Sequence, residues 1–447
     1  MVYNMASQKI AALRNHLKIP FYNNAYSLIG NQATSSILGM IFWVVVTRFY
    51  SSNQVGLGTG IYSAALLLTS LAAIGLGDGL TYDLPRVAYP DRLINAYFSL
   101  SSIVVITFAG AFILGQRWFS PGLEIIRQSP LSIMLFLSST IVIHLSMQQD
   151  ALFVADRVSI YSLSKNILAN LIRLPIFALL YTTNEWSLIL SAAISLLVGS
   201  LTIGKRYHLN ERPIHRYQIE LDPQIWKPTL GFSFGNYLMN IVVSLPNTLL
   251  PLFVLNIMGP TKSGYFYIAW IIPSLLAVIG RSFGSSVFVE SGREFNSIKI
   301  NTLRSMVISS CVLFPSVTLL VVLSNYVLLI FGKQYSLEGA ALVRLLLVSC
   351  IPLTYYGILV GVLKAQGKIK LLLFLAFIFT GLHIVGALFF IPISGLVGIG
   401  WAVIYARFIS FVVAVLFVWR ELTILDKRIL GNKISALYAR IINLSHE

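Results

Sequence analysis

The sequence has little charge and almost no cysteine. Only 11% of its 447 residues are charged, whereas a soluble domain carries roughly a quarter, because its surface must face water. The two cysteines, Cys311 and Cys350, lie within apolar stretches, so we expect small buried hydrophobic residues and not a disulfide or a metal pair. Hydrophobic residues make up 57% of the chain. Such a chain needs lipid around most of its surface.

Long apolar runs recur from Ala25 almost to the end. Crossing a bilayer as a helix takes about 20 mostly apolar residues, and continuous runs favour helices over the alternating strands of a barrel. We therefore predict an all-α polytopic membrane protein with about twelve transmembrane helices. The expected ranges are 26–47, 57–80, 94–115, 130–154, 158–182, 185–204, 230–257, 264–288, 303–331, 339–363, 369–391 and 397–419.

The chain looks like one six-helix unit used twice. The polar loop after the first span closes at Gly56 and the loop after the seventh closes at Gly264, and an aromatic helix start follows each. The fourth and tenth spans also end alike, in residues 153–157 and 363–368. An even number of helices in each unit makes both halves enter the membrane in the same direction, which is a common plan of transporters.

This repeat predicts two pseudo-symmetric six-helix lobes. The expected organisation is a cytoplasmic N-terminal segment (1–24), an N-terminal lobe (25–204), a basic cytoplasmic linker (205–228), a C-terminal lobe (229–419) and a cytoplasmic amphipathic tail (420–447).

The net charge of +16 is distributed unevenly along the loops. With the N-terminus placed inside, only six cations fall on the outer side, namely Arg48, Arg117, Arg127, Lys262, Lys333 and Arg344. This asymmetry follows the positive-inside rule and predicts a multi-pass protein of the cell membrane with both termini in the cytoplasm. The excess charge is expected to contact anionic membrane lipids, and a nucleic-acid partner is not expected.

The fifth span carries a polar, cationic face. At about 100° per residue, Ser162, Lys165, Asn166, Asn170 and Arg173 fall on one side of it, which is typical of a helix that lines a watery cavity. For the two cations we favour a functional site, because a full charge inside a span is costly. The alternative for Arg173 is a structural ion pair with Asp150 or Asp156.

Other polar residues extend this pattern. Asn236, Asn240 and Asn247 share one side of the seventh span, and Asn31 belongs to a shorter polar stripe in the first. Hydrogen bonds that only hold the helices together explain such asparagines as well as a cavity does. Arg407 in the last span is a further candidate for a functional cation.

Two more charged positions have open interpretations. Arg48 ends the first span, where an arginine commonly extends its guanidinium to the interface. Asp150, in the fourth span, is the candidate for carrying a coupling proton or sodium ion, although a salt bridge is the simpler interpretation. The sequence shows no metal-binding cluster, nucleotide loop or nucleophile elbow, so we predict no cofactor and no enzymatic activity.

The stretch from Gly39 to Gly56, with Thr47-Arg48 before a short polar loop, resembles the first-helix signature of polysaccharide flippases. These belong to the multidrug/oligosaccharidyl-lipid/polysaccharide exporter superfamily. Residues 362–370 are similar to the end of that family's tenth helix. Thr47 stands in place of the usual alanine, and the loop 51–55 lacks the proline.

The resemblance implies a MATE-like fold, with two lobes around a cavity that opens alternately to the two sides of the membrane. It also implies a substrate in which phosphate or pyrophosphate links an oligosaccharide to a polyprenol. Arg48 matches the family's first-helix arginine. The resulting hypothesis is a flippase for cell-surface polysaccharide biosynthesis, with Arg48, Lys165, Arg173 and Arg407 attracting the phosphate and Asn31, Asn236, Asn240 and Asn247 bonding sugar hydroxyls.

Two alternatives stay open. A multidrug-type cation antiporter of the same fold would need an accessible carboxylate, for which Asp150 is the candidate. A non-transporting scaffold would instead recruit other polysaccharide-assembly proteins through its basic inner loops.

Overall fold

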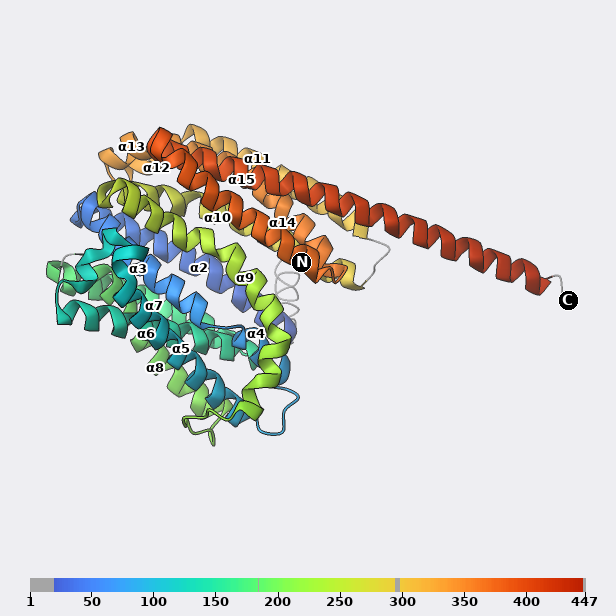
Figure 1. The fold of residues 1–447 in the computed structure, drawn as a ribbon, viewed down its shortest axis with the longest axis horizontal. Coiled ribbons are helices and arrows are strands. Elements are labelled where there is room, and N and C mark those ends of the chain that lie inside the picture. Colours follow the sequence, from blue (N-terminus) through green and yellow to red (C-terminus); the bar gives the residue numbers. More distant parts are fainter. Residues whose placement is uncertain (1–19, 184, 294–297, 445–447) are drawn as a thin grey trace, which may run out of the picture. The chain divides into compact units, whose positions relative to one another are not determined.

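The computed structural model describes residues 20–183, 185–293 and 298–444; some side chains within these ranges, including all beyond Glu421, are not described. All regular structure in this part of the chain is helical (Figure 1). The α-helices are α2 (Pro20–Phe49), α3 (Ser52–Ala72), α4 (Leu76–Asp83), α5 (Pro90–Phe119), α6 (Pro130–Ala155), α7 (Ile160–Leu180), α8 (Trp186–Glu211), α9 (Pro223–Met258), α10 (Pro260–Arg293), α11 (Ile298–Val322), α12 (Ser324–Leu329), α13 (Lys333–Val348), α14 (Cys350–Ala365) and α15 (Ile369–Leu444). Two short 3₁₀ helices, η1 (Pro121–Arg127) and η2 (Tyr181–Thr183), lie in connections.

Eleven segments of the described chain are long and apolar enough to cross a membrane. The last of them, Ile369–Glu421, has 53 residues, which as one straight helix would measure about 80 Å, far more than the roughly 30 Å hydrocarbon core. This segment contains the expected spans 369–391 and 397–419. The polytopic all-α prediction is therefore confirmed, and the difference between eleven and twelve lies in this one segment.

The chain reverses direction inside that segment. Gly395 has φ 58° and ψ −133°, a backbone conformation that glycine adopts readily and that no helix interior contains. The two arms then lie against each other, because a Cβ built on Gly398 would lie 2.1 Å from the carbonyl oxygen of Phe390. The rings of Phe390 and Tyr405 stack 5.7 Å apart across the same hairpin. The two predicted spans are thus separate arms joined by a tight turn.

A second break interrupts the predicted span 57–80. α3 ends at Ala72, and α4 begins at Leu76 after Ile74 (φ 36°) and Gly75 (φ 77°). Left-handed residues cannot continue a right-handed helix, so the end of this span is a separate short helix of eight residues.

The ends of α6 and α14 confirm the similarity of residues 153–157 and 363–368. In α6 the amide of Asp156 donates to Leu152, and the amide of Val158 donates to Phe153. The same two bonds recur 210 positions later, from Gln366 to Val362 and from Lys368 to Leu363. Arg157 (φ 61°) and Gly367 (φ 68°) supply the left-handed residue that this helix ending requires. Both halves thus end the equivalent helix with one hydrogen-bonding pattern.

The two glycines that close the matching loops pack against each other. A Cβ on Gly56 would lie 1.8 Å from the carbonyl oxygen of Pro260, and a Cβ on Gly264 would lie 2.2 Å from that of Ser52. Ser52 and Pro260 are related by the same 208-residue offset as the two glycines. The contact is therefore reciprocal, as expected where a pseudo-two-fold axis passes between α3 and α10.

The chain forms two compact units. The first comprises the described residues up to Ile271 together with Asn325–Ala340 and Ile391–Leu396, and the second comprises Ile272–Ser324, Ala341–Phe390 and the chain from Val397. The two units group residues that contact one another, and their limits differ in kind from helix-by-helix lobes. The predicted lobe boundaries therefore stay a prediction. In the predicted linker, α8 extends to Glu211 and α9 begins at Pro223, so only residues 212–222 are non-helical.

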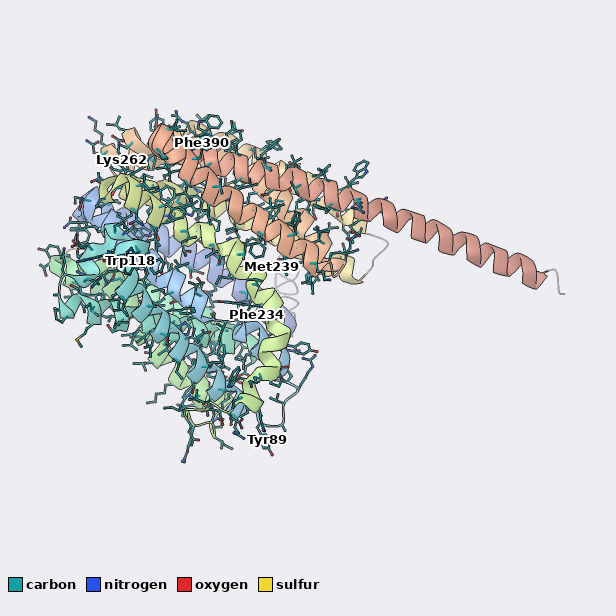
Figure 2. The ribbon with its side chains drawn as sticks, in the orientation of Figure 1. Tyr89, Trp118, Phe234, Met239, Lys262 and Phe390 are labelled. Carbon is teal, nitrogen blue, oxygen red and sulfur yellow. The ribbon has the colours of Figure 1, made fainter. Side chains whose placement is uncertain are left out.

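α5 shows how one helix of the first unit fits a bilayer. Tyr89 precedes its first residue and is 70% exposed, while Trp118 near its last residue is 84% exposed. Figure 2 shows these two rings at opposite ends of the helix. Exposed tyrosine and tryptophan concentrate at the two membrane–water interfaces. The 30 residues of α5, at 1.5 Å each, cover about 45 Å, which matches a bilayer with its headgroups.

The expectation for the cysteines is half right. Cys350 is buried and Cys311 is exposed, and both thiols are free. Cys311 shares one side of α11 with the exposed residues Val307 and Phe314, because residues four and three apart lie on the same side of a helix. The expectation of burial was wrong for Cys311 because hydropathy does not show which side of a span faces lipid.

Candidate functional site

The candidate site is built on α7, which packs against α2 and α8 within the first unit. The polar face predicted for this helix divides into two regions. Lys165 and Arg173 are eight residues apart, which is about 12 Å along the helix axis. Each cation has its own surroundings.

Lys165 forms a buried ion pair with Asp150 of α6. Its side chain is 0% exposed, and Nζ lies 2.9 Å from Oδ1 of Asp150. The ammonium also donates to the carbonyl and the hydroxyl of Ser146, at 2.5 and 2.9 Å. Three acceptors therefore occupy the three protons of the ammonium. Of the interpretations left open for Asp150, the structure shows the salt bridge, with Lys165 and not Arg173 as the partner.

Asp150 collects the neighbouring polar groups. The Ser162 hydroxyl donates to one carboxylate oxygen and the Asn166 amide to the other. Asn31 of α2 joins the group, with its amide nitrogen 3.4 Å from the Ser162 oxygen. The carboxylate side chain keeps 28% exposure, so this cluster is open on one side. The positive and negative charges within it cancel.

Arg173 lies among aromatic rings. Its guanidinium carbon is 3.9 Å from the centroid of the Phe42 ring and 5.7 Å from that of Tyr62. The Tyr267 ring of α10 extends this aromatic group through Trp43, whose ring lies 4.8 Å from it. Rings at these distances attract a cation through their negatively polarised faces. They hold the arginine without neutralising it.

The polar contacts of Arg173 are sparse. Nη2 donates one long hydrogen bond, 3.4 Å, to the carbonyl of Leu188 on α8, and the buried Nε has no hydrogen-bond partner among the described residues. No carboxylate of the described chain lies within ion-pair distance of the guanidinium. Arg173 therefore carries a positive charge inside a membrane-spanning helix that no described acid neutralises.

The other predicted site residues lie elsewhere in the sequence of helices. On α9, Asn240 and Asn247 are exposed, and the side chain of Asn236 lies outside the described residues. Arg48 donates to the carbonyl of Ile330 at 2.7 Å, which ties the end of α2 to the connection between α12 and α13. Arg407 belongs to the second unit, is 8% exposed, and donates to the Ser349 hydroxyl at 2.7 Å. The substrate-binding roles predicted for these residues stay predictions.

Sequence reasoning missed the aromatic part of the site. The rings come from three helices: Phe42 from α2, Tyr62 from α3 and Tyr267 from α10. A signal existed, because Tyr62 and Tyr267 belong to the aromatic stretches that follow the matching loops of the two halves. Among the described residues no group of histidines, cysteines and acids has the geometry of a metal site.

Comparison with known proteins gives a fold and no closer relation. No protein-family model matches the chain, and no curated protein matches it. An inward-facing multidrug resistance MATE family transporter of the MOP superfamily is 15% identical, with a TM-score of 0.70 over 88% of this chain and 96% of that one.

Two further solved structures are similar. The lipid II flippase MurJ, in an inward closed conformation, is 15% identical, with a TM-score of 0.73 over 88% of this chain and 87% of that one. A MOP superfamily transporter from Pyrococcus furiosus, described as having a binding pocket of reverse polarity, is 14% identical, with a TM-score of 0.58 over 92% and 95% of the two chains. The chain therefore has the fold that the MATE and MurJ transporters share.

Proposed function

We propose that this protein is a flippase that moves an oligosaccharide linked by phosphate or pyrophosphate to a polyprenol across the cell membrane by alternating access. The observation that carries the proposal is Arg173, an arginine in a membrane-spanning helix with no acidic partner in the described chain. A charge inside a span is costly and is commonly retained for substrate or ion binding. An anionic headgroup would supply the missing partner.

The type of cation supports a phosphate ligand. A guanidinium is planar, stays protonated and presents parallel N–H donors that match two phosphate oxygens. Phe42 and Tyr62 hold the guanidinium through their ring faces, which accept none of its N–H hydrogen bonds in the described contacts. Tyrosine and phenylalanine rings also offer flat apolar surfaces beside the headgroup, where the sugar begins. The polyprenyl chain would remain in the bilayer.

The charge balance of α7 favours an anion over a cation. Lys165 and Asp150 neutralise each other at 2.9 Å, so the surplus charge on this face is the positive charge of Arg173. A cation antiporter would require the opposite balance, with an available carboxylate. Asp150 already accepts bonds from Lys165, Ser162 and Asn166. This occupation weakens the antiporter alternative, while Asp150 as an ion-coupling residue stays a prediction.

The test is a flipping assay in reconstituted vesicles. A phosphate-linked polyprenyl oligosaccharide is placed in the membrane, and the accessibility of its sugar to an external glycosidase is followed over time. We expect Arg173→Ala to abolish protein-dependent translocation. Arg173→Lys should retain a part of it, because lysine keeps the positive charge and lacks the parallel N–H donors of a guanidinium. The matched control is Arg117→Ala, which removes an exposed arginine at the far end of α5.

Each other outcome has a consequence. Full translocation by a correctly inserted Arg173→Ala protein would refute the site. Absence of translocation by the wild-type protein, together with gradient-driven efflux of organic cations, would establish the antiporter. Absence of both activities would leave the scaffold for polysaccharide assembly.

A further inference from the structure

The linker between α8 and α9 is an ordered strap with a fixed position. Arg212 forms a bidentate pair with Asp156 at 2.7 and 2.8 Å and a second ion pair with Asp91 at 2.9 Å. At the other end, Arg92 pairs with Glu220 at 2.7 Å. Ordering an irregular segment costs about 1–2 kcal/mol per residue in backbone entropy. These contacts oppose that cost and place residues 212–222 along α5.

The strap runs along α5 in register with it. Arg212 contacts Asp91, His215 contacts Asn95 at 3.1 Å, the Tyr217 ring lies 5.7 Å from that of Phe98, and the amide of Glu220 donates to Ser99 at 3.1 Å. From Asp91 to Ser99 the helix advances about 12 Å. The chain from 212 to 220 therefore descends along the side of α5, away from the start of this helix and toward its middle.

This descent brings the strap to the edge of the hydrocarbon core. Exposed Trp118 marks the interface at the far end of α5 (Figure 2). The hydrocarbon core is about 30 Å thick, or about 20 helical residues. Counting back from Trp118 places the near boundary at about Phe98, which is the level at which the Tyr217 ring and the Glu220 amide contact α5, while the Glu220 carboxylate reaches back to Arg92. Ile219 lies at the same level.

Two isoleucines of the strap face away from the protein. Ile214 is 89% exposed and Ile219 is 86% exposed. Leaving an isoleucine in water costs about 1.5–3 kcal/mol relative to burying it. By the same count along α5, Ile214 lies about 8 Å farther from the hydrocarbon than Ile219 does. The two side chains are therefore alike in type and exposure and differ in depth.

The exposed basic residues near the strap suit a lipid surface, and the acid beside Ile219, Glu220, is paired with Arg92. Arg216 is exposed and its carbonyl accepts from Asn95, which puts it about 5 Å outside the boundary, at headgroup level. Lys205 and Arg206 are exposed on the last turns of α8. Basic residues at a membrane surface are attracted to anionic lipids by about 1 kcal/mol each.

We propose that the strap is a membrane-surface anchor in which Ile219 inserts into the leaflet on this side, while Arg216 binds the phosphates of anionic lipids. Ile214 remains in water above the headgroups. The anchor ties the connection between the two halves of the chain to the leaflet. This proposal does not depend on what the protein transports.

The experiment uses the full chain with Cys311→Ser, so that the buried thiol of Cys350 is the one native thiol left. A cysteine replaces Ile219 in one variant and Ile214 in the other, and each carries an NBD fluorophore. The proteins are reconstituted in phosphatidylcholine vesicles containing phosphatidylglycerol. Quenching is measured with a lipid that carries a nitroxide near its headgroup and, separately, with iodide in the water.

We expect the fluorophore at 219 to be quenched by the nitroxide lipid and shielded from iodide, and the fluorophore at 214 to show the reverse. Replacing phosphatidylglycerol with phosphatidylcholine should reduce lipid quenching at 219, and Arg216→Gln should reproduce this loss. Equal access of iodide to both positions would overturn the proposal. Equal shielding of both positions would also overturn it, because it would indicate a protein partner over the whole strap. A wild-type gel-filtration profile confirms that each variant is folded.

Discussion

The ion pair between Lys165 and Asp150 leads to an asymmetric prediction for two single substitutions. Asp150→Asn leaves an ammonium with 0% exposure and only uncharged acceptors, namely the new amide oxygen and the carbonyl and hydroxyl of Ser146. Lys165→Met leaves a carboxylate that is 28% exposed and keeps its bonds from Ser162 and Asn166. Removing one partner of a buried pair costs about 3–5 kcal/mol. We expect Asp150→Asn near the upper value and Lys165→Met near the lower one.

The double variant Lys165→Met/Asp150→Asn distinguishes the electrostatic pairing of the two side chains from their steric packing. With no charge left in the cluster, its cost should fall to about 1 kcal/mol, because replacing a whole buried pair by groups of similar size is often nearly neutral. The two single effects would then be strongly non-additive, as expected for residues in direct contact.

The free energy of unfolding can be measured by steric trapping in bicelles for the wild type and the three variants. A larger loss of unfolding free energy for Lys165→Met than for Asp150→Asn would refute the reasoning that Lys165 is the more deeply buried partner. A double variant as unstable as the sum of the single variants would refute the pairing itself.

Three further predictions concern the close packing at Gly56 and the docking of the strap (residues 212–222). Gly56→Ala should destabilise the fold by about 1–3 kcal/mol, because its Cβ would lie 1.8 Å from a backbone carbonyl of α10. Gly110 has open space around it, so the control Gly110→Ala should stabilise the fold by up to about 1 kcal/mol. Thermal unfolding compares the two variants, and equal midpoint temperatures would contradict the contact at Gly56. Burial lowers the pKa of His215 below its ordinary 6.5. His215 therefore binds a proton less readily when the strap is docked on α5 than when it is released. Docking of the strap should be complete above that value and weaken as the pH falls below it; faster hydrogen exchange in residues 212–222, corrected for intrinsic rates, would show this, and unchanged protection would contradict it. Arg212→Lys should loosen the same residues at neutral pH, because lysine cannot form the bidentate pair with Asp156; protection equal to the wild type would show that the fork is unnecessary.

Much of the fold could be predicted because hydropathy acts locally. The apolar runs located every span, including the two arms of α15 on either side of Gly395. The matching ends of α6 and α14 were visible as similar residues, since the left-handed turn at Arg157 and Gly367 depends on a few neighbours in the chain. The break at Gly75 was missed, because Gly75, Gly77 and Gly79 stand at the end of an apolar run that by its length also fits a continuous helix.

For the candidate site, the sequence predicts features within one helix and does not predict contacts between helices. The sequence alone determined that α7 has a polar face with two cations, because helical periodicity assigns residues to faces within one helix. Only the tertiary structure decided that Asp150 pairs with Lys165, that Asp156 pairs with Arg212, and that Arg173 lies among rings with no described acid within ion-pair distance. These partners depend on the rotation and register with which helices pack. Neither quantity can be read from the sequence of one helix.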